Sequence, residues 1–239
     1  MHKFFKLFLI VIAILLAVIV VLYGTYKLMN SRTYQVFGVL ITRVDTDEKV
    51  VALTFDDAPT AYTNEVLDVL AQKQVTATFY AIGQQIEKYP DLTKKIVANG
   101  NELGNHSYSH QRIIFKSQDF INNEIQTTNR LIRQAGYEGK ITFRPPNSKK
   151  LLGLPWYLDK HDIATVIWDV EPDTYGTTTE FFVSNAIENT RPGSIILLHP
   201  LCDTCGEQRQ ALPLIIDALK QEGYTFVTVS ELLQKARPQ

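Results

Sequence analysis

The 239-residue sequence contains only two cysteines, and its first 44 residues contain no acidic side chain. Two cysteines exclude a small scaffold held together by several disulfides. No internal repeat is present, and a composition of 45% hydrophobic and 21% charged residues excludes a disordered, collagenous or multi-span membrane chain. The chain carries a net charge of −1 and its first 44 residues carry +5, so the remainder carries −6. This acidic remainder lacks the basic surface that non-specific nucleic-acid binding requires, and we predict no nucleic-acid partner.

One long apolar run is present, from Leu7 to Tyr23, and the uncharged stretch continues to Tyr26. About 20 such residues suffice for a helix to cross the hydrocarbon core of a bilayer. No polar face interrupts the run, which argues against a buried core helix. Lys3 and Lys6 would also suit a cleaved secretory signal, but the run is longer than the apolar part of a typical signal, and no small-x-small cleavage site follows it. We therefore predict a membrane anchor over residues 1–30.

This anchor predicts a single-pass protein of the cell membrane, with residues 7–26 crossing the bilayer and the body outside the cell. Secretion after signal cleavage is the alternative. No cysteine directly follows the apolar run, which excludes a lipoprotein anchor. Basic residues flank the run on both sides, so charge alone biases the orientation only modestly. Residues 31–48 are predicted to be a linker with one additional strand within residues 34–44.

The body, residues 49–239, alternates between strand-like apolar runs and helical patterns. Strands are predicted at residues 50–55, 77–82, 102–105, 142–143, 164–168, 194–198 and 224–227. Helical patterns lie around residues 66–70, 92–97, 120–132, 181–187 and 214–219. Strands that alternate with helices imply parallel strands joined by crossovers. About seven such units in roughly 190 residues predict an α/β fold with a complete or incomplete barrel.

Two adjacent carboxylates, Asp56 and Asp57, follow the first predicted strand of the body. In a barrel the site lies beyond the carboxyl ends of the strands, and adjacent carboxylates repel each other unless a cation stabilises them. Successive strand residues point to opposite faces, so both carboxylates can serve one site only if the strand breaks there. Pro59 offers a reason for such a break. An isolated Asp-Asp pair would more simply be a solvated turn.

Three of the five histidines also fall at predicted strand ends: His106, His110 and His199. His106 and His110 face one side if their loop turns helically, and together with carboxylates they would suit zinc or a similar divalent ion. His199 leaves an apolar strand, where proton transfer is a better interpretation than a satisfied core histidine. Arg144 precedes two prolines and could orient a carboxylate, or could belong to a structural turn.

Five segments carry a family resemblance: TFDDAP (54–59), NHSYSH (105–110), RPP (144–146), WDVEPD (168–173) and LLH (197–199). In this order they resemble the motifs of the polysaccharide deacetylases, which form carbohydrate esterase family four and share the NodB-homology domain. The resemblance covers residues 50–233. It implies a distorted (β/α) barrel and the metal-dependent removal of N- or O-acetyl groups from sugars. Many members of the family are anchored outside bacterial membranes, which agrees with the predicted anchor.

The resemblance also implies a role for each motif residue. The metal, with zinc the first choice and cobalt, nickel or manganese as alternatives, would be bound by Asp57, His106 and His110. Asp56 would be the general base, held by Arg144, and His199 would be the general acid. A backbone N–H near Tyr108 would help to stabilise the developing oxyanion. The residues expected to bind substrate or support the site are Tyr108, Pro145, Trp168, Glu171, Asp173 and Leu197.

Several positions depart from the family pattern. Ala58 stands where glycine is usual, and Asn147-Ser148 stands where tyrosine-glycine is commoner, so the wall of the substrate groove is expected to differ. Glu171 replaces a usual aspartate, and Tyr175 replaces a usual tryptophan. The carboxylate that supports His199 therefore stays open among three residues: Asp169, Glu171 and Asp173.

The two cysteines form a C-x-x-C sequence, Cys202 to Cys205, just after His199. Such a pair can be a redox couple, half of a zinc site or a local disulfide. No second C-x-x-C is present, so a four-cysteine zinc site is excluded. Outside the cell a small disulfide beside His199 is favoured over a catalytic thiol.

The sequence thus predicts a membrane-anchored, metal-dependent deacetylase of a cell-envelope glycan, with peptidoglycan N-acetylglucosamine as the first choice of substrate. An acetylated glycan is the predicted partner, and no protein partner is predicted. A chitooligosaccharide, an exopolysaccharide or xylan are alternative substrates. A non-catalytic glycan-binding descendant of the fold is a second hypothesis, and a thiol-redox module built on Cys202 and Cys205 is a third. The redox hypothesis leaves the other clusters unexplained.

Overall fold

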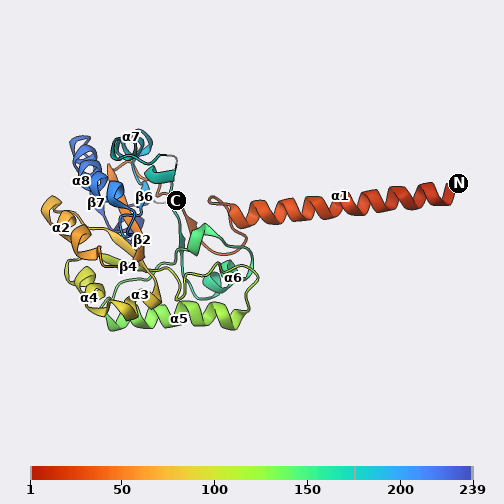
Figure 1. Cartoon of the computed structure of the whole chain (residues 1–239), viewed down its shortest axis with the longest axis horizontal. Coiled ribbons are helices and arrows are strands. Elements are labelled where there is room, and N and C mark those ends of the chain that lie inside the picture. Colours follow the sequence, from red (N-terminus) through yellow and green to blue (C-terminus); the bar gives the residue numbers. More distant parts are fainter. Residues whose placement is uncertain (1, 175, 238–239) are drawn as a thin grey trace.

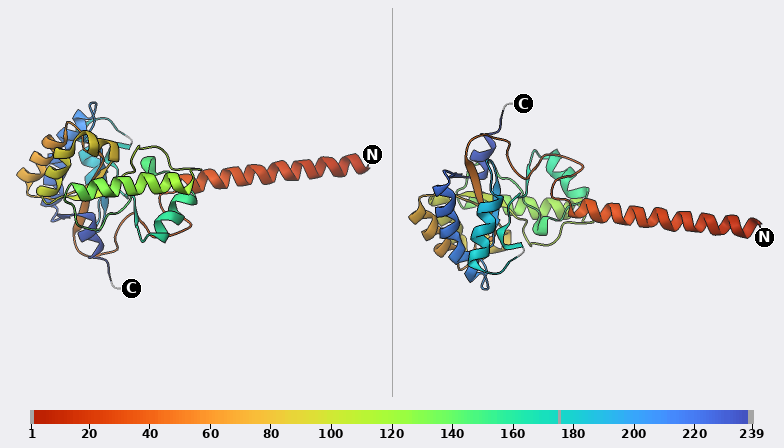
Figure 2. Two further views of the ribbon diagram at one scale, coloured as in Figure 1. Left: turned by 90° about the horizontal axis from the view of Figure 1, so that it is seen from below. Right: turned by 90° about the horizontal axis from the view of Figure 1, so that it is seen from above.

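The computed structural model describes residues 2–174 and 176–237 of the chain (Figure 1). Its first helix, α1 (His2–Asn30), extends away from the rest of the molecule, as both further views also show (Figure 2). The stretch Lys3–Asn30 has a mean hydropathy of 3.3 over its most apolar window, and none of that window is buried. By length and composition α1 is a candidate membrane span.

A parallel sheet lies at the centre of the remaining chain. Its strands have the order β4-β3-β2-β6, and β7 pairs with the start of β2. The bounds of these strands are β2 (Val50–Ala58), β3 (Thr78–Ala81), β4 (Glu102–Asn105), β6 (Ile195–Leu198) and β7 (Thr225–Val227). β2 is buried almost throughout, because a central parallel strand is covered on both faces. The predicted parallel α/β architecture is confirmed.

Short pairings extend this sheet toward a barrel. Strand β1 (Leu40–Ile41) pairs in parallel with β5 (Thr165–Val166). Phe143 bridges Asn105 on one side and Thr165 on the other, and Val170 bridges Ile196. The strands therefore continue from β4 through Phe143 and β5 back to β6, which gives a distorted, barrel-like arrangement.

Three predicted strands are much shorter than expected, and the one over residues 164–168 is reduced to the two residues of β5. Residues 142–143 contribute only the bridges of Phe143, because the prolines that follow Arg144 have no N–H to extend a ladder. The strand predicted within residues 34–44 is reduced to β1. The Gln35 side-chain amide donates hydrogen bonds to two backbone carbonyls of that segment, and Gly38 has φ of 69°, so the chain before β1 turns and does not run straight.

Helices surround the strands. Their bounds are α2 (Thr63–Lys73), α3 (Gly83–Lys88), α4 (Pro90–Ala98), α5 (Gln118–Gln134), α6 (Gly153–Lys160), α7 (Thr179–Asn189), α8 (Gly206–Gln221) and α9 (Val229–Leu233), with 3₁₀ turns η1 (Pro146–Ser148) and η2 (Pro172–Thr174). The five predicted helical patterns lie inside α2, α4, α5, α7 and α8. The short helices α3, α6 and α9 were not predicted, since one or two turns show little periodicity.

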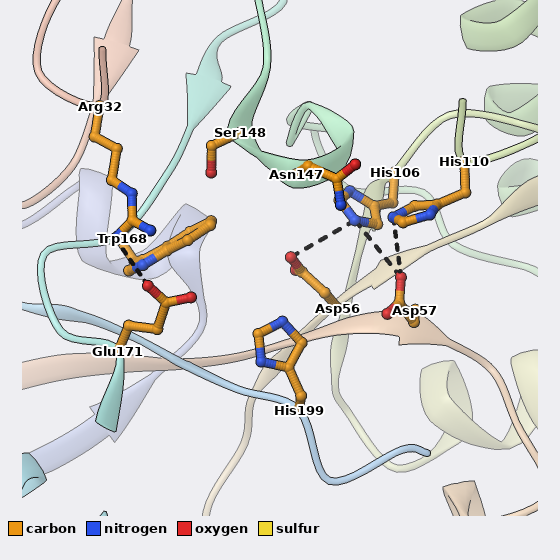
Figure 3. Close-up of a pocket in the computed structure, with 10 residues that line it drawn as sticks. All are labelled: Arg32, Asp56, Asp57, His106, His110, Asn147, Ser148, Trp168, Glu171 and His199. Atoms are coloured by element: carbon orange, nitrogen blue, oxygen red, sulfur yellow. Dashed lines mark ion pairs between the residues drawn. The ribbon is translucent and has the colours of Figure 1, made fainter. Parts of the chain in front are cut away.

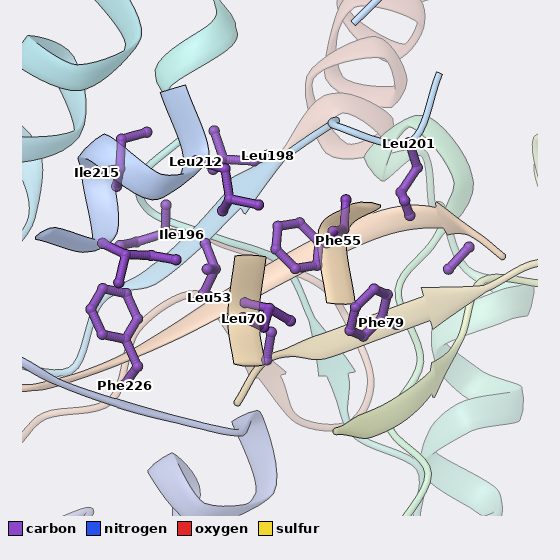
Figure 4. Packing of buried hydrophobic residues seen from close by; sticks show 14 of the residues in the cluster. Leu53, Phe55, Leu70, Phe79, Ile196, Leu198, Leu201, Leu212, Ile215 and Phe226 are labelled. Carbon is purple, nitrogen blue, oxygen red and sulfur yellow. The ribbon is translucent and has the colours of Figure 1, made fainter. Parts of the chain in front are cut away.

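The hydrophobic core lies on both faces of β2, and Figure 4 shows part of the cluster on one of them. Leu53 and Phe55 belong to one buried cluster with α2 and α8, whereas Ala52 belongs to a second cluster on the opposite face. The Phe55 ring packs against that of Phe79 with a centroid separation of 5.0 Å. This packing holds the strand in place up to Phe55. The backbone at the next residue, Asp56, is therefore rigidly supported.

Candidate active site

A pocket lies where β2, β4 and β6 end (Figure 3). It is lined by Arg32, Asp56, Asp57, His106, His110, Asn147, Ser148, Trp168, Glu171 and His199. The position agrees with the rule that places sites beyond the carboxyl ends of barrel strands. Residues from six separate parts of the sequence therefore meet in one cavity.

The two carboxylates share the pocket because β2 is irregular there. The pairing of β2 with β3 shifts its register between Phe55 and Ala58, and Asp57 has φ of 65°. A bulge of this kind re-aims the side chain that would otherwise point to the opposite face. The break that the sequence argument required is therefore present, and it lies before Pro59.

Three donor atoms converge at one side of the pocket. Asp57 Oδ1 lies 3.3 Å from His110 Nε2 and 3.7 Å from His106 Nε2. The ligand atoms of these three residues all lie within 4.8 Å of one another. Among the described residues Asp57 Oδ1 is buried without a hydrogen-bond partner, as expected of an oxygen that faces a cation. The donor set fits a divalent metal that takes nitrogen and oxygen ligands.

Both histidines are prepared for that role. His106 Nδ1 lies 2.7 Å from the carbonyl oxygen of Arg144, and donation to this oxygen leaves the lone pair on Nε2. Burial lowers the pKa of His110, and the neighbouring His106 lowers it further. A neutral imidazole is the form that binds metals.

Glu124 on α5 holds the loop that carries the histidines. Its Oε2 accepts hydrogen bonds from the backbone N–H groups of Tyr108 (3.0 Å) and Ser109 (2.8 Å), and its Oε1 accepts one from the Ser109 hydroxyl. The N–H of Ser107 donates to Asn105 Oδ1. Glu124 was not predicted, because a single glutamate on an amphipathic helix gives no signal in the sequence.

These hydrogen bonds correct the prediction about Tyr108. Its backbone N–H is bound to Glu124 and is not free to stabilise an oxyanion. Its hydroxyl donates to Glu87 Oε2 at 2.8 Å, and the residue does not line the pocket. The N–H of His110 donates to Ser107 Oγ, so it too is bound within the loop. The prediction that a backbone N–H near Tyr108 stabilises the oxyanion is therefore wrong.

Asp56 is held by a fully buried arginine. Arg144 Nη1 donates to Asp56 Oδ1 (2.8 Å) and to Thr54 Oγ1 (2.9 Å), while its other nitrogens donate to the carbonyls of Val166 and Ile167. Burial alone would raise the pKa of Asp56, but the Arg144 guanidinium, helped by two neighbouring histidines, holds that pKa below its usual value. Asp56 is therefore an oriented, ionised carboxylate, and its Oδ2 lies 3.6 Å from His106 Nε2.

His199 stands on the other side of the pocket and is supported by Asp173. His199 Nδ1 lies 2.9 Å from Asp173 Oδ2. Burial by itself lowers the pKa of His199, but the hydrogen bond to Asp173 and the nearby carboxylates outweigh it and raise that pKa to about 9. Asp169 instead accepts hydrogen bonds from Ile195 N–H and the Ser194 hydroxyl. Of the three carboxylates left open by the sequence, Asp173 is the one in contact with His199.

Glu171 and Trp168 meet a residue that was not predicted. Arg32, only two residues beyond α1, pairs with Glu171 at 2.8 Å, and its guanidinium lies 4.8 Å from the centre of the Trp168 ring (Figure 3). Asn147 Oδ1, on the opposite wall, accepts a hydrogen bond from Arg112. Arg32 had no sequence signal beyond its charge, because its contacts come from residues more than 130 positions away.

The remaining predicted site residues lie beside the pocket and do not line it. Leu197 is fully buried within β6, and Pro145 is buried immediately before η1. Cys202 and Cys205 form a disulfide in the loop after His199. Tyr175 lies outside the described residues.

Known proteins resemble both the sequence and the structure. A family model described as polysaccharide deacetylase matches residues 43–166. A peptidoglycan-N-acetylglucosamine deacetylase of Bacillus cereus is 36% identical over 194 residues, which cover 78% of this chain and 69% of the relative. The crystal structure of a peptidoglycan N-acetylglucosamine deacetylase superposes with a TM-score of 0.77 at 32% identity, covering 82% of this chain and 94% of the other. A pseudoenzyme of carbohydrate esterase family four from Bacillus anthracis superposes with a TM-score of 0.74 at 30% identity, covering 83% and 70%.

Proposed function

Since the chain belongs to the polysaccharide deacetylase family, as its motifs predicted, we propose that it removes the acetyl group from N-acetylglucosamine in peptidoglycan. The observation that carries this proposal is that an ionised Asp56, a His199 bound to Asp173 and three metal-type donors line one pocket. The names of similar proteins support the substrate: one of Bacillus cereus is a peptidoglycan-N-acetylglucosamine deacetylase. Others of the family are named for chitooligosaccharides, which makes those sugars the alternative substrate.

The metal would be held by Asp57, His106 and His110. A divalent ion bound there would lower the pKa of a water molecule and polarise the acetyl carbonyl. Two imidazoles and one carboxylate suit zinc, with cobalt, nickel or manganese as alternatives. The unpartnered Asp57 oxygen supports this assignment, because most buried carboxylate oxygens accept a hydrogen bond.

Asp56 is the general base in this proposal. It takes a proton from the water that attacks the acetyl carbon, and Arg144 fixes the direction of its carboxylate. Because Arg144 keeps the pKa of Asp56 low, the carboxylate is available as a base at neutral pH. The buried carbonyl oxygens of Val166 and Ile167, which accept hydrogen bonds from Arg144, keep the pair from rotating.

His199 is the general acid. An amide anion is a very poor leaving group, so the sugar nitrogen must receive a proton as the carbon–nitrogen bond breaks. Asp173 keeps His199 protonated and orients Nδ1, which leaves Nε2 to donate that proton. The products are acetate and the free amino sugar.

The α1 helix would place this chemistry at the outer surface of the cell membrane. Its length and its mean hydropathy of 3.3 support a membrane span, and a cleaved signal is the alternative. An anchored enzyme suits a substrate of the cell envelope. Cell-wall deacetylases among the relatives support the outward orientation of the body.

The proposal is tested by acetate release from the full-length protein in detergent. Peptidoglycan and N-acetylated chitooligosaccharides are offered after chelation, and again after adding zinc, cobalt, nickel or manganese. We expect metal-restored acetate release, faster on peptidoglycan. Faster release from chitooligosaccharides would make these sugars, and not peptidoglycan, the assigned substrate. If the protein bound glycan but released no acetate with any of these metals, the hypothesis of a non-catalytic glycan-binding protein would replace the proposal.

A further inference from the structure

Three large apolar side chains are exposed on one face of the catalytic body. Phe115, Leu152 and Trp156 are 84%, 48% and 41% exposed. They lie on two neighbouring segments, residues 111–117 and 149–156, which we call the loop face. The segments touch each other, because Gln118 Nε2, just after the first, donates to the carbonyl of Gly153 in the second. Phe115 has φ of 54°, a region that bulky residues seldom adopt, and it lies in a bend of its loop.

The loop face is basic as well as apolar. Neither segment contains an acidic residue, whereas residues 45–239 as a whole carry −6. Arg112 and Lys116 are exposed on the first segment, and Lys149 is half-buried on the second. Next to the face, Lys160 Nζ lies 5.1 Å from the centre of the Trp156 ring. Exposed aromatic and leucine side chains among lysines and arginines are typical of a surface that lies in lipid headgroups.

The loop face lies directly beside the end of α1. The backbone N–H of Lys150 donates to the carbonyl of Met29 at 3.4 Å, and the Lys150 ammonium contacts the carbonyl of Ser31. Lys149 contacts the Asn30 side chain. All views show α6, which carries Trp156, next to the carboxyl end of α1, with α8 on the far side of the body (Figures 1 and 2). A bilayer crossed by α1 therefore meets the loop face first.

We propose that the loop face binds the headgroup layer of the membrane that α1 crosses, an inference that rests on the proposed anchoring. Such contact fixes the body against the lipid surface and prevents free rotation on the linker. The pocket shares this location, because Arg32 lines it two residues beyond α1 and Arg112 of the loop face holds Asn147 on its wall. The substrate is then an acetylated glycan that comes within reach of the lipid headgroups.

The test uses tryptophan quenching in the full-length protein. The chain has two tryptophans, Trp156 and Trp168, and Trp168 is only 6% exposed. The protein is reconstituted into vesicles of phosphatidylglycerol and phosphatidylcholine that contain a headgroup-nitroxide lipid, and the Trp156 emission is taken as the difference from Trp156→Phe. We expect the nitroxide lipid to quench at least half of this emission. Emission that is unchanged, in protein that floats with the vesicles, overturns the proposal.

A double variant and a matched control separate lipid contact from general effects. Phe115→Ser with Leu152→Ser should reduce the quenching of Trp156 at least twofold, whereas Leu214→Ser should not. Leu214 is 49% exposed but lies on α8, far from α1. In both the double variant and Leu214→Ser, acetate release from soluble chitooligosaccharides in detergent should match that of the wild type. This activity shows that the active site is folded, independently of the membrane. Equal quenching in all three proteins overturns the proposal, and failure of the wild type to float overturns the anchoring beneath it.

Discussion

At the scale of single residues, the pair of Asp56 and Arg144 combines full burial with an ion pair of 2.8 Å. We predict that Asp56→Asn lowers kcat for acetate release by about 10²- to 10⁴-fold, the usual contribution of a general base. The asparagine still fills the space but takes no proton. Metal affinity, measured by competition with a chromogenic chelator, should stay within about threefold, because the Asp57 and histidine donors are kept.

Asp91→Asn is the control for that variant, since its carboxylate is about 90% exposed on α4. It should leave kcat unchanged. More than a tenth of wild-type kcat in Asp56→Asn would assign the base to another group.

The contact between His199 and Asp173 predicts a change in pH dependence. A general acid must be protonated, so activity falls as the pH rises through the pKa of His199, which is about 9. Asp173→Asn removes the carboxylate that raises this pKa and leaves the burial that lowers it. The alkaline limb of the kcat/KM profile should therefore move by more than about one pH unit toward lower pH.

Wild type and variant are compared at the same metal loading, because a bound cation also lowers the pKa of His199. Asp203→Asn removes an equal charge from the exposed loop after His199 and should move the limb by less than about 0.3 unit. An alkaline limb that does not respond to Asp173→Asn would remove His199 from the acid role.

At the scale of elements, the strand ends were predictable and their surroundings were not. An apolar run followed by Asp56 and Asp57 indicates a buried parallel strand with polar residues at its end, and β2 agrees. The sequence indicated only that β2 had to break near Asp57, because both carboxylates had to reach one site. It did not predict the bulge itself. Glu124 could not be found this way, since its three hydrogen bonds join an ordinary helix position to a loop 15 residues or more earlier in the sequence.

Helix α5 positions the metal donors through Glu124, which carries the third prediction. Glu124→Ala removes the acceptor of two backbone N–H groups and one hydroxyl in the loop between His106 and His110. The loop loses its support, so metal affinity should fall by about 10- to 100-fold, as for other residues that orient metal ligands. Zinc titration calorimetry measures the change.

Glu87→Ala is the matched control, because Glu87 contacts only the hydroxyl of Tyr108 in the same loop. It should keep the zinc affinity within about threefold. If Glu124→Ala bound zinc as tightly as the wild type while remaining folded, the loop would be rigid without α5.

At the scale of the whole molecule, the sequence predicted the parts but not how they join. The anchor and the catalytic body were separate predictions with a linker between them. In the structure Arg32 and the residues just before it contact segments 149–150 and 168–171, so the linker forms one wall of the pocket. Contacts over so great a sequence separation depend on the final packing, which periodicity and motif spacing do not encode.

The metal site should also contribute to the stability of the whole body. A ligand that binds only the folded protein stabilises it by RT ln(1 + [L]/Kd), about 2.7 kcal/mol at a hundredfold excess over Kd. For a domain of this size that corresponds to a rise in Tm of about 5–10 °C. Chelation of the detergent-solubilised protein should remove this rise, and added zinc should restore it.

Two histidine variants test whether the zinc that raises Tm binds at the three donors in the pocket. His110→Asn should abolish the response of Tm to zinc, because it removes a donor 3.3 Å from Asp57. His161→Asn should keep the response, since His161 lies at the end of α6 and contacts Tyr157, away from the pocket. A zinc-dependent Tm that survives in His110→Asn would place the stabilising metal elsewhere in the protein, and the three donors in the pocket would then need another explanation.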